Sequence, residues 1–179
     1  MDDFEKRGKE IIEWLQQEFA GIRTGQATPA ILDSVKVDSY GTRVPINQVA
    51  SVGIEDARTL RISPWDTDSI TAIETAITDA DLGVSVSTDS SGLRVSFPEL
   101  TSERRQQLLK VAGAKLEEAR ISVRGARDEA IKELDKDEKA GDISKDALFA
   151  AKETIQKQVD ATNHTLEELF KNKEGEISN

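Results

Sequence analysis

The sequence contains no cysteine, so it cannot form disulfide bonds, thiolate metal sites or cysteine nucleophiles. It also lacks any apolar run approaching the roughly 20 residues of a membrane span, and the N-terminal MDDFEKRGKE lacks the apolar core of a signal peptide. These absences predict a cytoplasmic protein. Aromatic residues are only 4% of the chain, as in many disordered proteins. The apolar residues recur at regular spacing, however, so we expect a folded, helix-rich chain.

Basic residues are outnumbered, with 24 against 34 acidic residues, which gives a formal net charge of −10 at pH 7. A chain with this charge is repelled by phosphate at long range, which argues against nonspecific binding of nucleic acid. Any contact with RNA must therefore be local.

Apolar spacing predicts helices at both ends of the chain and strands in the middle. Residues 1–29 carry apolar residues three or four apart, and this helix should end near Gly25 and Pro29. Residues 30–100 alternate with period two around Val35 and Val37 and in TLRIS and LRVSF, and they enclose one helix that begins at Asp66 and ends before Gly83. We expect Trp65 to lie in the core of this segment.

Residues 101–179 return to the helical period and predict two long helices separated at KAGDIS, with Gly141 as the stop and Ser144 as the next N-cap. Their apolar stripes need partners, so we predict an α+β fold: an elongated antiparallel three-helix bundle from residues 1–29 plus 101–179, with an inserted β/α/β domain, 30–100. Two connecting segments should form a hinge, whose candidate residues are Gly25, Pro29, Ala30, Pro98, Glu99 and Thr101.

The sequence offers little to an enzyme. The single histidine, His164, lies in the last predicted helix, where a slender bundle provides no pocket. IRTGQATP lacks the Gly-Lys-Ser/Thr ending of a nucleotide-binding loop, and DKDEKAGD lacks the ligand pattern of a calcium loop. We therefore expect no catalytic activity, no cofactor and no metal.

One stretch departs from the acidic balance. Between Arg104 and Arg127 there are seven basic and two acidic residues, a local charge of +5. Arg120, Arg124 and Arg127 fall within an arc of about 60° on a helical wheel. They can contact RNA phosphates, or they can pair within the helix, Arg124 with Asp128 and Arg120 with Glu117. Charge alone does not decide between these alternatives.

Longer motifs carry a family resemblance. EFAGIRTGQATPAILD, YGTRVPINQVASVGIEDARTLRISPWD, LTSERRQQLLK, ARISVRGARDEA and GDISKDAL together resemble the ribosome recycling factors nearly end to end. The resemblance implies an L-shaped protein made of a three-helix bundle and a hinged β/α/β domain. It also implies that the protein binds the post-termination bacterial ribosome and, with elongation factor G and GTP hydrolysis, splits it into subunits.

The resemblance further implies that basic residues of the bundle touch large-subunit ribosomal RNA, and that the small domain and hinge meet elongation factor G. Carried over by motif, the RNA-facing residues are Arg23, Arg124 and Arg127; Arg120 is added from its place on the wheel. Gln26 and Asp128 stand where the family commonly has arginine, which weakens the expected cationic contact. We expect a monomer.

A coiled-coil interaction protein that never touches RNA is the alternative from another class. It requires a second apolar stripe left exposed after the three helices pack, and the outward faces of the predicted helices are charged. Co-sedimentation with ribosomes separates the two hypotheses.

Overall fold

The computed structural model describes residues 2–178, which form two compact units. One unit, the bundle, contains the chain up to Thr24 and from Ser102 onward; the other, the small domain, is Gly25–Thr101. The first boundary lies earlier in the chain than the predicted break between residues 29 and 30. Ala27 explains the shift, because its side chain is buried in the core of the small domain and its N–H donates to the carbonyl of Ala57 at 2.8 Å.

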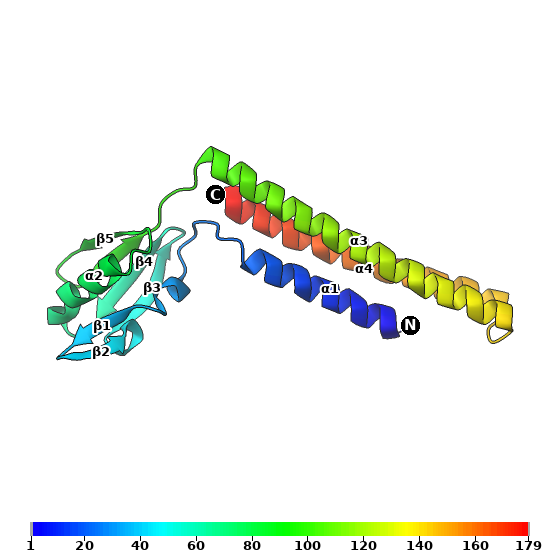
Figure 1. Cartoon of the computed structure of the whole chain (residues 1–179), viewed down its shortest axis with the longest axis horizontal. Helices are drawn as coiled ribbons and strands as arrows, with labels where there is room; N and C mark the ends of the chain where they lie inside the picture. The colour runs from blue at the N-terminus through cyan, green and yellow to red at the C-terminus, as the bar shows by residue number, and fades with distance from the viewer. Residues whose placement is uncertain (1, 179) are drawn as a thin grey trace. The chain divides into compact units, whose positions relative to one another are not determined.

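The bundle consists of α1 (Asp2–Ala20), α3 (Ser102–Ala140) and α4 (Lys145–Ser178), and each helix contacts the other two (Figure 1). With a rise of about 1.5 Å per residue, α3 and α4 are about 58 and 51 Å long. The helix α1 ends before Gly21, earlier than the predicted stop at Gly25. The turn between α3 and α4 matches its prediction: Gly141 adopts φ +82°, and the Ser144 hydroxyl accepts a hydrogen bond from the Ala147 N–H at 3.1 Å.

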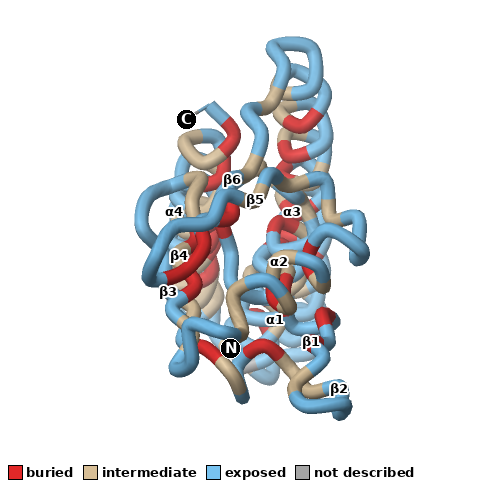
Figure 2. Tube along the Cα trace, turned by 90° about the vertical axis from the view of Figure 1, so that its left-hand side faces the viewer, coloured by how far each residue is buried: buried red, intermediate tan, exposed pale blue. Residues whose placement is uncertain are grey.

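The core of the bundle follows the predicted apolar stripes of α3 and α4, whose buried residues recur along each helix (Figure 2). Leu148, near the start of α4, is only partly buried. With 19 residues against 39, α1 is too short to cover the whole of α3. Polar Thr162 also lies in the core, where its hydroxyl donates to the carbonyl of Gln158 at 2.8 Å. A Cβ placed on Gly8 of α1 would lie 3.1 Å from that hydroxyl, so glycine allows α1 to approach α4 closely here.

The small domain contains two antiparallel sheets. A hairpin joins β1 (Lys36–Ser39) to β2 (Thr42–Pro45), and a four-stranded sheet has the order β3-β4-β6-β5. Its strands are β3 (Ala50–Asp56), β4 (Thr59–Pro64), β5 (Ser85–Thr88) and β6 (Leu93–Ser96). The helix α2 (Ile70–Asp79) contacts β1 and β5, and three short 3-10 helices complete the domain: η1 (Pro29–Leu32), η2 (Ile46–Gln48) and η3 (Thr67–Ser69). The predicted α+β fold, with helical bundle and β domain, is confirmed.

Alternation along β4 and β6 explains why the four-stranded sheet has one apolar and one polar face. Leu60, Ile62, Leu93 and Val95 are fully buried, together with Ile73 and Ile77 of α2. The residues between them point to the other face, where Arg61 and Arg94 are direct neighbours across the strands. Such a like-charge pair is unfavourable unless each charge is compensated.

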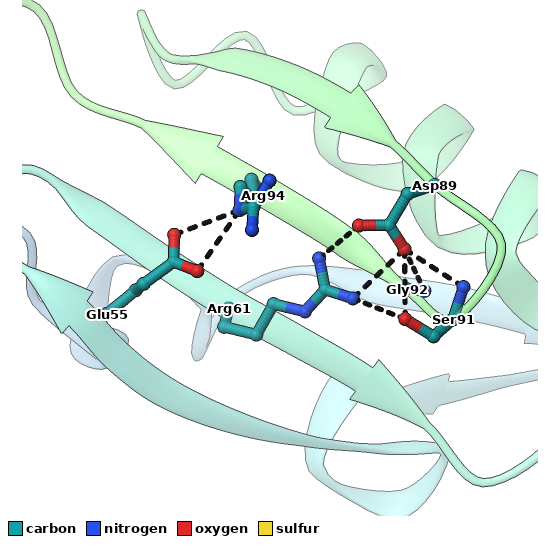
Figure 3. A network of polar contacts seen from close by, with 6 residues as sticks. All are labelled: Glu55, Arg61, Asp89, Ser91, Gly92 and Arg94. Atoms are coloured by element: carbon teal, nitrogen blue, oxygen red, sulfur yellow. Dashed lines mark hydrogen bonds and ion pairs between the residues drawn. The ribbon is translucent and has the colours of Figure 1, made fainter.

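Both arginines on the polar face are compensated by carboxylates (Figure 3). Glu55 accepts from Arg94 Nε at 2.9 Å, and Asp89 accepts from Arg61 at 2.6 and 3.0 Å. Asp89 also accepts from the backbone N–H groups of Ser91 and Gly92, both at 2.9 Å, and so organises the turn between β5 and β6. The Arg61 guanidinium, followed by the Ser91 and Gly92 donors, holds the pKa of Asp89 well below its usual range.

The expectation that Trp65 lies in the core is wrong, because its side chain is 67% exposed. Trp65 comes directly after β4, where its backbone N–H donates to the carbonyl of Val49 at 3.1 Å. The core is already filled by aliphatic side chains from β4, β6 and α2, which leaves the indole at the surface. The predicted N-cap next to it is correct: the Asp66 carboxylate accepts from the Asp68 N–H at 3.0 Å, at the start of η3.

No helix in the described range combines the length and the apolar character that a transmembrane segment requires.

Candidate functional site

The helix α3 is continuous through its three central arginines, so their side chains leave the same side of one rod. Counted at about 100° per residue, Arg120, Arg124 and Arg127 lie beside the buried stripe that contains Ala119, Val123 and Ala126. The Arg124 side chain is 55% exposed, and those of Arg120 and Arg127 are about one-third exposed. We call these three residues the arginine stripe.

Each arginine of the stripe has a carboxylate partner. Arg120 Nη2 lies 2.8 Å from Glu167 Oε1 of α4, and Arg124 Nη2 lies 2.8 Å from Glu117 Oε1 of α3. Arg127 donates from Nε and Nη2 to Asp128 Oδ1, at 3.0 and 2.9 Å. The alternative of pairing within the protein was therefore correct in kind, but both specific pairs predicted for it were wrong.

The carboxylate partners of the arginine stripe differ from the predicted ones because each guanidinium bonds to the carboxylate that lies within its reach. Arg127 occupies the adjacent Asp128, which leaves Arg124 to bond back across two turns to Glu117. Arg120 leaves its own helix and ties α3 to α4. All three carboxylates are more than half exposed, and exposed ion pairs contribute only about 0–1 kcal/mol. Each guanidinium can therefore exchange its carboxylate for another anion at small energetic cost.

Asp128 has a second consequence. Its carboxylate accepts two hydrogen bonds from Arg127 and so offsets the charge of that guanidinium. Arg124 is then the most exposed guanidinium of the stripe, held by a single hydrogen bond to an exposed glutamate. Within the stripe, Arg124 is the residue best placed to exchange its partner for a phosphate.

Arg23 is not part of the stripe. It follows the end of α1, is exposed, and has no ion-pair partner among the residues that the structure describes. Two ion pairs between α1 and α3, Glu18 with Lys115 at 3.4 Å and Arg7 with Glu129, set these helices side by side. The end of α1 therefore lies beside the first third of α3, whereas the stripe occupies the middle of α3. A ligand that binds both Arg23 and the stripe has to follow the bundle along its length.

Four of the candidate hinge residues, Gly25, Pro98, Glu99 and Thr101, lie in the two segments next to the boundaries between the units. Gly25 adopts φ +76°, which favours glycine, and a Cβ there would lie 3.4 Å from the carbonyl oxygen of Pro98 and 3.3 Å from Leu100. The two connecting segments thus touch each other at Gly25. Glu99 and Thr101 are exposed in the segment before α3. Pro29 and Ala30 instead lie within η1, part of the small domain itself.

The structure also places the single histidine and the acidic side chains. His164 is exposed on α4. Over the described part of the chain, no three or more histidine, aspartate or glutamate side chains gather closely enough to hold a metal ion. The sequence analysis did not predict the groove beside Trp65, because it assigned that side chain to the core. The position of this aromatic residue, directly after the end of a strand, could have indicated that it lies at the surface.

Comparisons with known proteins identify the family of this chain. The family model for "Ribosome recycling factor" matches residues 15–177. Ribosome-recycling factors from Carboxydothermus hydrogenoformans and Symbiobacterium thermophilum are 45% and 42% identical; the matches cover 94% and 98% of this chain and 91% and 95% of those proteins.

Solved structures give the same result. A solution structure of the ribosome recycling factor has a TM-score of 0.64 and 34% identity, covering 99% of this chain and 94% of its own. A second structure describes the T. thermophilus ribosome recycling factor and the E. coli elongation factor G bound to the E. coli post-termination complex. Its TM-score is 0.58 at 38% identity, with 98% of this chain and 95% of that one covered. By sequence and by fold, the chain belongs to the ribosome recycling factor family.

Proposed function

We propose that this chain splits post-termination ribosomes into subunits in the cytoplasm, together with elongation factor G and GTP, and that it does so without catalytic chemistry of its own. The observation that carries the proposal is the cationic stretch of α3 between Arg104 and Arg127, with a local charge of +5 in a chain of −10. The family membership supports it, as does the related factor bound with elongation factor G to a post-termination complex.

In this proposal the bundle binds large-subunit ribosomal RNA through Arg23 and the arginine stripe. Arg124 exchanges Glu117 for a phosphate. Arg120 and Arg127 then exchange Glu167 and Asp128 for phosphates in the same way. The released glutamates and Asp128 remain in place, so the net attraction is modest. Modest affinity suits a factor that must leave the ribosome after each cycle.

The bundle acts as a stiff wedge in this mechanism, because α3 and α4 are long, continuous and joined by a short turn. The small domain receives the push of elongation factor G, and the two connecting segments that touch at Gly25 form the hinge. Free energy comes from GTP hydrolysis on the elongation factor. The chain works as a monomer that transmits this push to the contacts between the subunits.

The test replaces Arg124 with glutamate and measures ribosome pelleting over a range of salt concentrations. We expect weaker binding and a salt dependence flatter by about 0.7–0.9 for each phosphate that the variant no longer neutralises. Lys136→Glu is the matched control, since Lys136 is exposed on the same helix about 160° away from Arg120. An Arg124→Glu salt slope equal to that of the unaltered chain rules out the role of the stripe.

A further inference from the structure

The small domain carries a groove that the ribosomal RNA contacts do not use. Its volume is about 590 Å³, and Trp65 forms part of its wall with the indole 67% exposed. The other lining residues are mostly apolar and come from η1, η2, β2 and β3: Pro29, Leu32, Asp33, Pro45, Ile46, Asn47, Ala50, Ser51 and Val52. Large exposed aromatic residues beside apolar grooves are typical of binding sites for other proteins.

The indole is presented by a backbone that is fixed on both sides. The Trp65 N–H donates to the carbonyl of Val49 at 3.1 Å. The next residue, Asp66, accepts from the Asp68 N–H at 3.0 Å and from the Tyr40 hydroxyl at 3.1 Å. The backbone beneath the indole therefore needs no ordering when a partner covers the side chain. Trp65 is an anchor whose backbone is already in place.

Tyr40 makes the same surface more unusual. It is 93% exposed and adopts φ +51° in the turn between β1 and β2, a conformation that a bulky side chain rarely adopts. Its interaction in the structure is the hydrogen bond to Asp66, beside the anchor. The positive φ follows from the two-residue hairpin turn, in which Gly41 also adopts a positive φ of +83°. The turn leaves Tyr40 exposed and joined through Asp66 to the second exposed aromatic residue, Trp65.

The charges around the groove decide between two kinds of partner. Asp33 is the charged residue that lines it, and none of its described lining residues is basic. Asp66 and Asp68, one and three positions after Trp65, are also acidic. Nucleic acid bases can stack on exposed aromatic rings, but the attached phosphates need cations nearby. The Asp33 carboxylate in the lining repels phosphate and attracts lysine or arginine. The surface is thus complementary to a protein segment and not to RNA.

We propose that the groove beside Trp65 docks a segment of a protein partner in which an apolar side chain stands next to a lysine or arginine. The apolar side chain enters the groove against the indole, and the basic group pairs with Asp33. The assignment of the partner rests on the proposed function, in which the small domain meets elongation factor G. Trp65 is the residue on which this contact depends most.

The main experiment compares Trp65→Ala with Ile54→Ala. Ile54 is also a large exposed apolar residue of the small domain, 62% exposed, but it does not line the groove. We expect Trp65→Ala to lower the rate of subunit splitting at limiting elongation factor G by about tenfold or more, as at other tryptophan anchors. Ile54→Ala should stay within about twofold. Ribosome pelleting without the elongation factor should be unchanged in both variants.

Charge complementarity is tested separately with Asp33→Lys. This variant keeps the indole and should still lower elongation-factor-dependent splitting by about fivefold or more, because the new cation faces the partner's basic group. Splitting by Trp65→Ala or Asp33→Lys at the rate of the unaltered chain overturns the proposal. Circular dichroism of each variant checks that the small domain remains folded.

A direct readout uses the two tryptophans of the chain, Trp14 and Trp65. Fluorotryptophan labelling gives each a fluorine NMR signal, and Trp14→Phe assigns them. The Trp65 signal should shift when elongation factor G, a GTP analogue and ribosomes are added together. If ribosomes alone shift the signal, the groove contacts the ribosome and the proposal is overturned. If the unaltered chain fails to split ribosomes, the proposed function is wrong, and the Trp65 signal still decides whether the elongation factor docks.

Discussion

The bundle and the small domain are stabilised in different ways. In the bundle the buried side chains recur at regular helical spacing, whereas the packing of the small domain also depends on individual close contacts of the backbone. Leu108, Ala112, Ala119 and Val123 recur along α3 at helical spacing, and their packing needs no unusual backbone. In the small domain, Gly92 is buried so closely that a Cβ there would lie 2.2 Å from the carbonyl oxygen of Ile62. A periodic core tolerates local change better than one that includes such a contact. The two regions should therefore respond differently to substitution.

The two tryptophans make the comparison measurable. Trp14 lies in the bundle, with the Lys115 ammonium 5.6 Å from its ring centroid, and Trp65 lies in the small domain. A Trp14→Phe background reports unfolding of the small domain, and a Trp65→Phe background reports unfolding of the bundle. Each substitution below is made in the background that reports on its own unit.

The largest effect is expected for Gly92→Ala. Because the obstructing atom belongs to the backbone of β4, the strand itself has to move, and overpacking of this kind costs about 2–3 kcal/mol of the free energy of unfolding. Urea denaturation followed by Trp65 fluorescence measures the change. Gly53→Ala is the control, since Gly53 also lies in the sheet but a Cβ there meets nothing within 4 Å; it should change stability by less than about 0.5 kcal/mol. Equal stabilities for the two variants contradict this account of the small domain.

A smaller effect, which depends on pH, is expected for Asp89→Asn. The pKa of Asp89 is depressed in the folded state by the Arg61 guanidinium, so its charged form stabilises the small domain at any pH above the unfolded value of about 4. That contribution is lost as the pH falls below about 4 towards the folded pKa. Asp89→Asn should therefore be less stable than the unaltered chain at pH 7, and the difference should shrink in acid.

Thermal unfolding between pH 7 and pH 3 measures this convergence. Asp79→Asn removes the same charge from the exposed end of α2 and should leave the melting temperature nearly unchanged at each pH. A difference between Asp89→Asn and the unaltered chain that stays constant across the range shows that the carboxylate acts only through its shape.

The sequence predicts the bundle better than the small domain, because the core of the bundle is periodic throughout and that of the small domain only in part. The 3.6-residue period located α3, α4 and most of their buried stripe, and Gly141 and Ser144 marked the turn between them. In the small domain, the strand β3 contains Gly53 and a run of exposed residues, so alternation gave no signal for it. Trp65 was misplaced because its type favours burial, while the surface position follows from contacts made elsewhere in the chain. Periodic burial can be predicted from neighbouring residues in the sequence. Close backbone contacts, and aromatic residues for which the core has no room, depend on parts of the chain that are distant in sequence.

The arginine stripe illustrates the same limit within the bundle. Its three positions followed from helix geometry, but two of their partners lie beyond the reach of simple spacing rules. Glu167 belongs to α4, and its contact with Arg120, 47 positions earlier in the chain, depends on how the two helices are aligned. Arg124 pairs with Glu117 because Arg127 occupies Asp128. Competition among neighbouring carboxylates decides which guanidinium is easiest to release.

Among the substitutions expected to change stability, the smallest effect, and a favourable one, is expected for Gly125→Ala in the middle of α3. Gly125 is exposed and a Cβ there meets nothing within 4 Å, so alanine removes conformational freedom from the unfolded chain and should raise the stability of the bundle by about 0.5–1 kcal/mol. Gly113→Ala should do the same, because the space around Gly113 is also open. The two glycines differ in position: Gly113 lies seven residues before Arg120, on the side of the stripe, and Gly125 lies about 140° from Arg120. Urea denaturation followed by Trp14 fluorescence measures the gain in stability of both variants. Ribosome pelleting then shows on which side of α3 the RNA lies. If the RNA lies against the stripe, Gly125→Ala should pellet as the unaltered chain does, and Gly113→Ala should pellet less well. Weaker pelleting by Gly125→Ala alone moves the RNA to the other side of α3.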